Sequence, residues 1–347
     1  MSDKPGLYGF YDSGSKQPIM HKDAIPKSIN SSKEASKLWV NQSIENFKVE
    51  LNNLFAEKVM PLKWTTISQS SVAIIYSICY GNGKYVVGGG SNTDGGQMAY
   101  STDGITWTPI SQSIFTGFIR SICYGNDKFI AVGAKGKMAY STDGITWTAI
   151  RQSIFTGYIY TICYNNGKFV AGGASGQMAY STDGITWTAI SQSIFTGAIF
   201  SICYDNGKFV AGGASGRMAY STDGITWTAI SQSILTGTIF SICYGKGKFV
   251  AVGGVTNSAG QMAYSTDGIT WTAISQSIFT GFIESICYGN GKFIAAGRND
   301  KIAYSMDGIT WTAINSSTLA GLHTVNYYNG RFIVGGINMA YCQVGVV

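Results

Sequence analysis

The aspartates of a repeated segment are the first residues whose type and spacing could support chemistry. The segment S-x-D-G-x-T-W occurs six times. A row of carboxylates could serve acid–base catalysis, but glycoside hydrolysis needs two of them about 5–10 Å apart across one bond. We interpret them instead as structural: the carboxylate accepts hydrogen bonds from turn amides, the glycine permits positive φ, and the tryptophan supplies a large buried face. These residues are Asp103, Asp143, Asp183, Asp223, Asp267 and Asp307, with Trp107, Trp147, Trp187, Trp227, Trp271 and Trp311.

Other groups that could perform catalysis or bind metal are scattered. Outside these segments the acids of the repeat region are Asp94, Asp127, Asp205, Glu284 and Asp300, each at a different place in its repeat. The chain has two histidines and no C-x-x-C. Six of the seven cysteines occupy equivalent positions in S/T-I-C-Y, where they are expected to be buried free thiols in a reducing compartment. We therefore predict no catalytic residue, no metal site, no cofactor and no enzyme activity.

A second group of residues stands out because it differs between nearly identical repeats. It comprises the residue before each S/T-I-C-Y and some residues two positions earlier. An incomplete ring of aromatic side chains with one arginine, one glutamate and one histidine could stack on sugars and bind their hydroxyls. Alternatively, these side chains only fill space between repeats. The candidate ligand-binding residues are Tyr76, Arg120, Tyr158, Tyr160, Phe200, Phe240, Glu284 and His323.

The connections before each M-A-Y segment also vary. Insertions at 91–97 and 254–261 favour a role in binding, because packing does not require an insertion.

The elements that must position these residues follow from the repeat itself. Tryptophans recur 40–44 residues apart from Trp64 to Trp311, which makes seven units. Each unit has four short segments rich in β-branched and aromatic residues, bounded by N-G, S-G or D-G turns. This pattern predicts an all-β, seven-bladed β-propeller of four-stranded blades over 61–347.

The two ends of the repeat region complement each other. The first unit begins at K-W-T-T-I-S without M-A-Y-S-T-D-G, and the last stops at N-M-A-Y-C without T-D-G-I-T-W-T. We expect the strand at 62–68 to complete the last blade and close the ring. In up-and-down blades the two variable sets then share one face, and the aspartate turns lie on the other.

The region before the repeats has a different character. Residues 1–30 show no period and are expected to be extended. Residues 31–60 predict an α-helix, with a capping box from Ser31 to Glu34 and an apolar stripe of Val40, Ile44, Phe47, Leu51 and Leu54. This stripe either packs on the propeller or forms a short coiled coil between chains.

The composition of the chain disfavours some classes of binding partner. The net charge of +6 comes from scattered Lys and Arg residues, which disfavours nucleic acid. No apolar stretch reaches the roughly 18 residues of a membrane helix, and the first residues lack a signal-peptide core. We therefore expect synthesis in the cytoplasm without a signal peptide, and no membrane insertion.

The repeated segment, as it stands from Ser101 to Trp107 and in its five other copies, resembles the Asp-box (BNR) repeat of sialidase-like and sortilin-like propellers, shortened by one residue before Thr-Trp. The resemblance implies a propeller with the box on the hairpin between the third and fourth strands, in a structural role. A sialidase would also imply an arginine triad, but the propeller arginines lie in different units and no triad can be assigned.

The layout of leader, helix and repetitive β head resembles bacteriophage or phage-tail-like fibre and receptor-binding proteins. It suggests a non-catalytic recognition module in a virion or tail-like particle. Its propeller would bind a cell-surface glycan or receptor, residues 1–60 would bind a particle or baseplate protein, and the chain could form a homo-oligomer. The alternatives are an intracellular protein-interaction scaffold and a sialidase-like glycosidase.

Overall fold

The computed structural model describes residues 10–11, 18–19, 40–48, 62–67, 71–152, 154–191, 194–231, 234–255, 258–275, 278–298, 301–314, 319 and 321–343. The chain divides into two units, Met1–Pro61 and Leu62–Val347. In the first unit, β1 (Phe10–Tyr11) pairs with β2 (Pro18–Ile19), and residues 40–48 form an α-helix.

The described residues of the predicted apolar stripe are exposed on the helix. Val40 and Ile44 are each 47% exposed, and Phe47 is 57% exposed. The rest of the predicted leader and helix, including Ser31, Glu34, Leu51 and Leu54, lies outside the described residues. None of the described helices is long and apolar enough to cross a bilayer.

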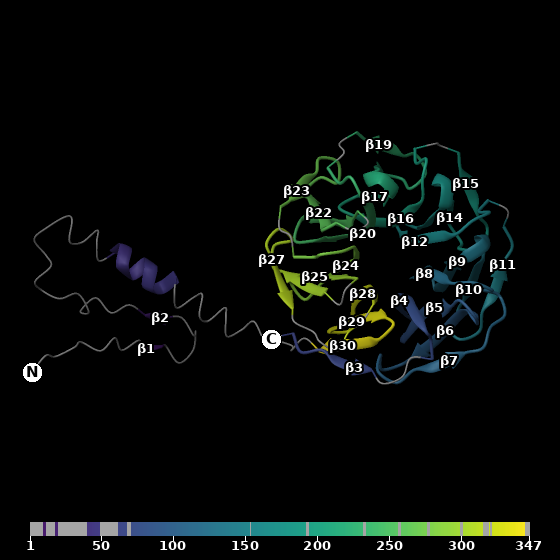
Figure 1. Ribbon diagram of the computed structural model, residues 1–347, viewed down its shortest axis with the longest axis horizontal. Helices are drawn as coiled ribbons and strands as arrows, with labels where there is room; N and C mark the ends of the chain where they lie inside the picture. The colour runs from purple at the N-terminus through teal and green to yellow at the C-terminus, as the bar shows by residue number, and fades with distance from the viewer. Residues whose placement is uncertain are drawn as a thin grey trace, which may run out of the picture. The chain divides into compact units, whose positions relative to one another are not determined.

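The second unit is a ring of seven four-stranded antiparallel sheets, as the sequence predicted (Figure 1). Blade 1 contains β4 (Ile74–Gly81), β5 (Lys84–Ser91), β6 (Gly95–Ser101) and β7 (Thr108–Ile110). Blade 2 contains β8 (Ile119–Gly125), β9 (Lys128–Gly133), β10 (Met138–Ser141) and β11 (Thr148–Ile150). Blade 3 contains β12 (Ile159–Asn165), β13 (Lys168–Gly173), β14 (Met178–Ser181) and β15 (Thr188–Ile190). Short 3₁₀ turns join the second and third strands in blades 2 to 4, at Ala134–Gly136, Ala174–Gly176 and Ala214–Gly216.

The other four blades repeat this arrangement. Blade 4 contains β16 (Ile199–Asp205), β17 (Lys208–Gly213), β18 (Met218–Ser221) and β19 (Thr228–Ile230). Blade 5 contains β20 (Thr238–Gly245), β21 (Lys248–Gly254), β22 (Gly260–Ser265) and β23 (Thr272–Ile274). Blade 6 contains β24 (Ile283–Gly289), β25 (Lys292–Gly297), β26 (Lys301–Ser305) and β27 (Trp311–Ile314). Blade 7 contains β28 (Leu322–Tyr328), β29 (Arg331–Gly336), β30 (Met339–Gln343) and β3 (Thr65–Ile67).

Blade 7 closes the ring by the predicted pairing of the two ends of the propeller. Strand β3 pairs antiparallel with β30, with Thr65 opposite Tyr341 and Ile67 opposite Met339. Trp64, just before β3, packs against the buried cluster between blades 6 and 7. The first and last segments of the propeller are therefore paired within one sheet, and the ring is closed between them.

A tight turn joins the first and second strands of each blade and favours their pairing. In blade 3 its two central residues are Asn166 and Gly167, with φ of 48° and 71°. Two consecutive positive φ angles are typical of the type I′ turn, whose twist matches that of the flanking strands and which favours Asn-Gly. Blade 2 departs from this pattern, because Asp127 takes the second position with φ of 56°.

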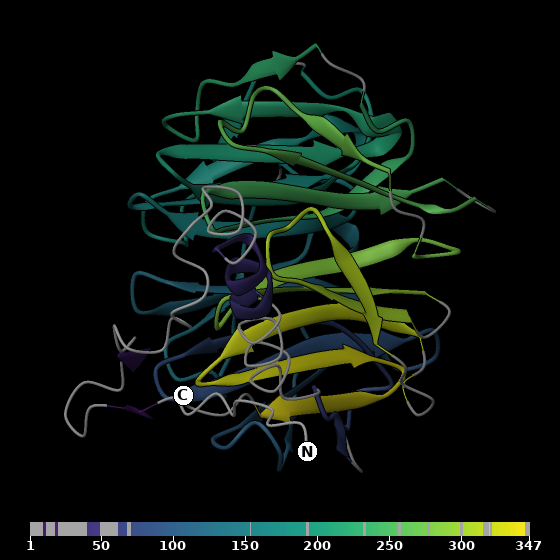
Figure 2. The same ribbon diagram turned by 90° about the vertical axis from the view of Figure 1, so that its left-hand side faces the viewer.

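The core consists of wedges between neighbouring blades, and Figure 2 shows the sheets stacked face to face. In one wedge, Val86 and Met98 of blade 1 pack against Ile119, Ile122 and Phe129 of blade 2. Phe129 and its equivalents in blades 3 to 7 are fully buried. Because each sheet buries both faces against its neighbours, the repeat needs the whole ring for stability.

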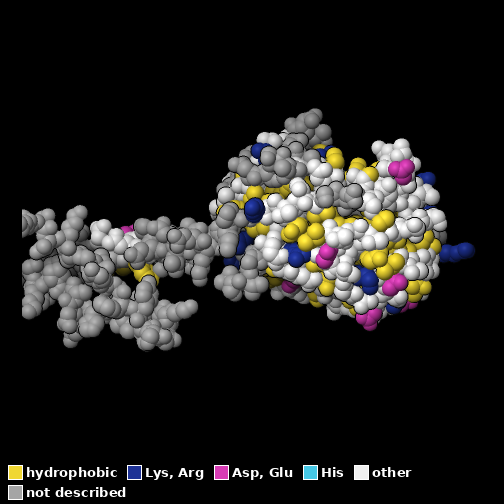
Figure 3. All heavy atoms as spheres, turned by 90° about the horizontal axis from the view of Figure 1, so that it is seen from below, with side chains coloured by type: hydrophobic (Ala, Val, Ile, Leu, Met, Phe, Trp, Pro, Cys, Tyr) yellow, Lys and Arg dark blue, Asp and Glu magenta, His cyan; other side chains and the backbone are white. Residues whose placement is uncertain are grey.

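Charged residues make up 12% of the chain. On the face drawn in Figure 3, acidic and basic side chains lie singly among uncharged ones.

Candidate functional site

A β-bulge lies at the same place in the first strand of every blade. In blade 3, Ile159 pairs with Gly173 and Thr161 pairs with Gly172, which leaves Tyr160 without a partner in the ladder. A bulge turns a side chain away from the direction that regular pleating would give it. The bulged residues, here called the mouth ring, are Tyr76, Arg120, Tyr160, Phe200, Phe240, Glu284 and His323.

A glycine opposite each bulge makes this geometry feasible. A Cβ on Gly173 would lie 2.7 Å from the carbonyl oxygen of Tyr158, and one on Gly297 would lie 2.6 Å from that of Phe282. Both distances are too short for any other residue without backbone movement. The glycine that pairs with the residue before each bulge was the sequence signal for the bulge, and sequence reasoning missed it.

The mouth ring lines a central cavity of about 550 Å³ at the start of the first strands. Its members are half-buried, whereas the residue before each one, such as Ile119 or Ile159, is fully buried. On each first strand, the mouth-ring side chain therefore faces the cavity, and the residue before it packs between blades. Tyr158 does not line the cavity, but its ring stacks on Tyr160 with centroids 5.5 Å apart.

Aromatic side chains form an arc along one part of the mouth ring. The ring centroids of Tyr160 and Phe200 lie 4.6 Å apart, and those of Phe200 and Phe240 lie 5.3 Å apart. Beyond the arc, the rings of His323 and Tyr76 lie 4.7 Å apart. All of these contacts join neighbouring blades. The side chains therefore pack on one another and still present a half-exposed surface to the cavity.

Arg120 interrupts this surface between two tyrosines. Its Cζ lies 4.1 Å from the ring centroid of Tyr76 and 6.0 Å from that of Tyr160, within cation–π range. Its Nε is buried and has no hydrogen-bond partner. The pKa of Tyr160 is raised, because burial outweighs the opposing effect of the Arg120 charge.

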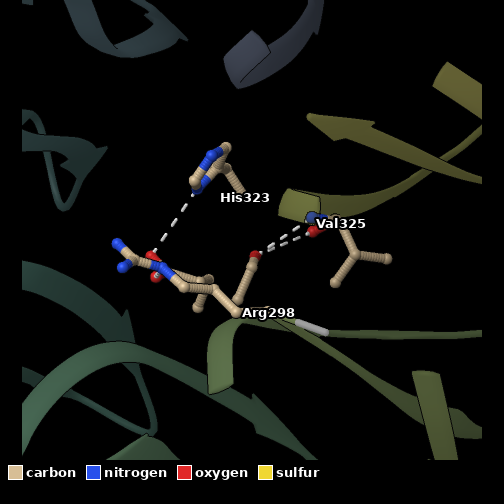
Figure 4. Close-up of polar contacts among 5 residues, drawn as sticks. Arg298, His323 and Val325 are labelled. Atoms are coloured by element: carbon tan, nitrogen blue, oxygen red, sulfur yellow. Dashed lines mark hydrogen bonds and ion pairs between the residues drawn. The ribbon is translucent and has the colours of Figure 1, made fainter. Parts of the chain in front are cut away.

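The acidic member of the mouth ring is neutralised by its neighbours. Arg298 donates from Nε to Glu284 Oε1 at 2.5 Å, and His323 Nδ1 lies 3.8 Å from Glu284 Oε2 (Figure 4). The Glu284 side chain is 11% exposed. Arg298 also lines the cavity, although it was not among the predicted site residues. A signal was present, since Arg298 occurs in the same repeat as Glu284, at a position where the other repeats have Gly, Ala or Ile.

Below the mouth ring, hydroxyl groups tie the blades together. The amide of Ile122 donates to Ser77 Oγ at 2.9 Å, and that of Ile202 donates to Thr161 Oγ1 at 3.2 Å. Comparable bonds from the next blade reach Ser121, Ser201, Ser241 and Ser285. The Ser or Thr of S/T-I-C-Y therefore has a structural role, which the sequence analysis did not assign.

The six aspartate turns lie on the opposite face, between the third and fourth strands. Asp103 Oδ1 accepts from the amides of Thr106 at 2.7 Å and Ile105 at 2.8 Å, and from Ser101 Oγ at 2.8 Å. The amide of Gly104, whose φ is 74°, donates to Ser101 Oγ. These hydrogen bonds lower the pKa of Asp103 to about 2, with the Thr106 amide contributing most. The other five aspartates accept equivalent bonds.

The cysteines require a correction. All seven are free, but Cys123, Cys163 and Cys203 are only half-buried. Two of these three, Cys163 and Cys203, line a second hollow of about 360 Å³ farther along the first strands. Desolvation nevertheless raises the pKa of Cys163 far above that of a free thiol.

The two insertions lengthen hairpins between the second and third strands of blades 1 and 5. The residues at 91–97 extend the hairpin of β5 and β6, where Ser91 pairs with Gly95. The described residues of 254–261 lengthen β21 and β22, where Gly254 pairs with Gly260. None of these described residues lines the central cavity.

These features define the chain as a seven-bladed β-propeller with a variable ring at the mouth of its central cavity. No protein-family model and no curated protein matches the sequence. Among solved structures, YCF48 from Cyanidioschyzon merolae is 17% identical, with a TM-score of 0.63 over 81% of this chain and 98% of that chain. YCF48 bound to D1 peptide is 15% identical, with a TM-score of 0.64 over 83% and 96%.

Virginiamycin B lyase from Staphylococcus aureus shares the fold as well. It is 10% identical, with a TM-score of 0.70 over 82% of this chain and 99% of that chain. At these identities the likeness establishes the propeller fold alone.

Proposed function

We propose that this chain is a non-catalytic recognition module whose propeller binds a glycan at the mouth ring. The observation that carries the proposal is the coincidence of three properties at the same seven positions. These residues vary between repeats, they leave the β-ladder at a bulge, and they line one cavity. A residue outside the ladder can change without disturbing strand pairing, so the fold is free to vary its ligand contacts there.

The chemistry of the ring supports a sugar ligand. The arc of Tyr160, Phe200 and Phe240 offers apolar surface for sugar rings, while Arg120 and His323 offer hydrogen-bond donors for hydroxyls. Hydrolysis has less support. The described lining residues include one carboxylate, Glu284, and Arg298 already binds it, whereas glycosidases generally use two carboxylates.

The order of leader, helix and propeller along the chain suggests a role for the whole protein. The turn bonding of Asp103 supports assignment of the repeat as a shortened Asp box. A recognition head preceded by a leader and a helix with an exposed apolar stripe suits a fibre or receptor-binding protein of a phage or tail-like particle, with the glycan on a cell surface. Residues 1–60 would then join the chain to the particle, and the stripe would join copies of the chain.

The test is binding of the purified chain to a glycan array and to isolated bacterial envelopes. Phe200→Ala should weaken binding roughly two- to tenfold, the range expected for one aromatic contact. Ile145→Ala is a matched control, since Ile145 is 36% exposed on the opposite face, in an aspartate turn. Binding that depends equally on both residues, or on neither, would remove the mouth ring from the proposal.

A protein ligand is the second candidate. The structure of YCF48 bound to D1 peptide shows that a propeller of this general shape can hold a peptide. A protein retained from lysate by wild type, lost with Phe200→Ala and accompanied by no glycan binding would favour this candidate. Turnover of fluorogenic glycosides would instead indicate an enzyme.

A further inference from the structure

The charges around the central cavity are unequal, and Arg120 is the member without a counter-ion. Glu284 lies against both Arg298 and His323, so the acid of the ring is already compensated. Among the described residues, Arg120 forms no ion pair, and its buried Nε has no hydrogen-bond partner. Because Arg120 lines the cavity and has no ion-pair partner among the described residues, its charge is available to an anionic ligand that enters the cavity.

The position of this cation is fixed by the surrounding rings. The Cζ of Arg120 lies 4.1 Å from the ring centroid of Tyr76, 5.3 Å from that of Tyr158 and 5.4 Å from that of Phe118. An arginine held over aromatic faces loses little further freedom when it binds an anion. Its planar group can donate two parallel hydrogen bonds to a carboxylate, which a lysine cannot do.

The neighbours of Arg120 indicate what must surround the anion. On one side, Tyr160 leads into the aromatic arc, with Phe200 centred 4.6 Å from it. A ligand that reaches both features carries a negative group next to an apolar ring face. A sugar ring bearing a carboxylate has this form, because its C–H face is apolar and its acid projects from the rim.

We propose that the mouth ring selects acidic saccharides, with Arg120 binding the carboxylate of a uronate and the arc from Tyr160 to Phe200 stacking on sugar rings. The saccharide part rests on the proposed function. The carboxylate part rests on the uncompensated guanidinium alone.

The experiment measures binding of galacturonate and glucuronate oligosaccharides to the full chain by calorimetry, each beside its methyl ester. The ester keeps the sugar ring and removes the charge. Wild type should bind the acids about tenfold or more tightly than the esters, as expected for a hydrogen bond to a charged group. This preference should weaken as salt rises.

Two variants assign the effect to Arg120. Arg120→Gln should bring acid and ester to the same affinity, and Arg120→Lys should restore part of the difference. Arg217→Gln is the matched control: Arg217 is exposed, precedes β18 on the same face and does not line the cavity. It should leave the preference for the acid intact.

The outcomes separate this inference from the proposed function. Equal binding of acid and ester, unaffected by Arg120→Gln, would overturn the inference and leave glycan recognition standing. Binding of an acidic peptide but of no saccharide would overturn both, even if it depended on Arg120. Absence of binding to either uronate or its ester, with neutral glycans bound on the array, would also overturn the inference alone.

Discussion

Ser201 and Ile242 join two neighbouring blades through a hydrogen bond at the centre of the ring. The amide of Ile242 donates to Ser201 Oγ at 3.0 Å, and Ser201 is 8% exposed. At six of the seven blade junctions, a first-strand hydroxyl accepts in this way from a backbone amide of the next first strand. Hydrogen bonds to hydroxyl groups near the cavity thus join the blades in addition to the apolar packing between them.

Replacing this hydroxyl should weaken the ring. We expect Ser201→Ala to lower the free energy of unfolding by about 1–3 kcal/mol, because it leaves the Ile242 amide buried without a partner. Ser201→Thr should cost less than about 0.5 kcal/mol, because Thr161 makes the same bond in blade 3. Urea unfolding of both variants measures the difference. Equal stability of Ala and Thr variants would show that the bond contributes nothing.

Replacing two neighbouring residues of β8 should change the stability of the propeller by very different amounts. Ile119 is fully buried between blades, so Ile119→Ala should destabilise the propeller by about 2–5 kcal/mol. Arg120 lies at the bulge without an ion pair and loses its contacts with the rings of Tyr76 and Tyr158 in Arg120→Gln, so this variant should cost about 1 kcal/mol or less. Thermal and urea unfolding would decide this. A large loss with Arg120→Gln would mean that the mouth ring is a packing element.

The aspartate turns predict acid sensitivity. The pKa of Asp103 is about 2 in the folded chain and about 3.9 in an unfolded one. Because the folded pKa is the lower one, the carboxylate stabilises the fold fully above about pH 4, and this contribution is lost as the pH falls towards 2. Asp103→Ala should cost about 1 kcal/mol at pH 7, a small value because the side chain is exposed.

The informative measurement is the stability gap between Asp103→Ala and wild type across this range. The gap should narrow between pH 4 and pH 2, while the five other turns titrate identically in both proteins. Asp103→Asn keeps an acceptor oxygen without the charge, and it should show a smaller gap at pH 7. A gap that is constant down to pH 2 would contradict the assignment of the low pKa to Asp103.

The thiols should be inert in the folded chain. Cys79 is 4% exposed, and burial raises its pKa to about 12. At pH 8 its thiolate fraction is then about a thousandfold below that of a thiol with a pKa near 9, and disulfide reagents attack only the thiolate. Titration with a chromogenic disulfide should detect all seven cysteines in guanidinium and react far more slowly with the native protein. Rapid native reaction of Cys79 would indicate that blade 1 opens.

Most of the fold could be predicted because its sequence signals are local. Tryptophan spacing set the number of blades, and Asn166-Gly167 with its equivalents marked the hairpins. The residues that line the cavity were selected by their variation, but their geometry was not foreseen. The bulge residue is Tyr, Arg, Phe, Glu or His in different blades, so no side-chain type encodes it. The information lies across the ladder, in Gly173 and its equivalents.

The contacts of Arg298 were less predictable for another reason. It meets Glu284 from the adjacent strand of the same blade, 14 residues away, and His323 of the next blade approaches the same carboxylate. The approach of His323 depends on how two blades are rotated about the ring axis, whereas the contact between Arg298 and Glu284 lies within one blade. Single-sequence patterns contain no measure of that rotation.

The short closure of blade 7 has a mechanical consequence. Tension applied through residues 1–61 enters the ring along β3, which is held by three residue pairs with β30, whereas β5 and β6 share seven. Under load β3 should therefore detach first and leave the remaining strands of blade 7 paired. The chain between the applied load and the ring would then lengthen by a few residues before any complete blade unfolds. Detachment of β3 would thus be the first mechanical unfolding step of the propeller.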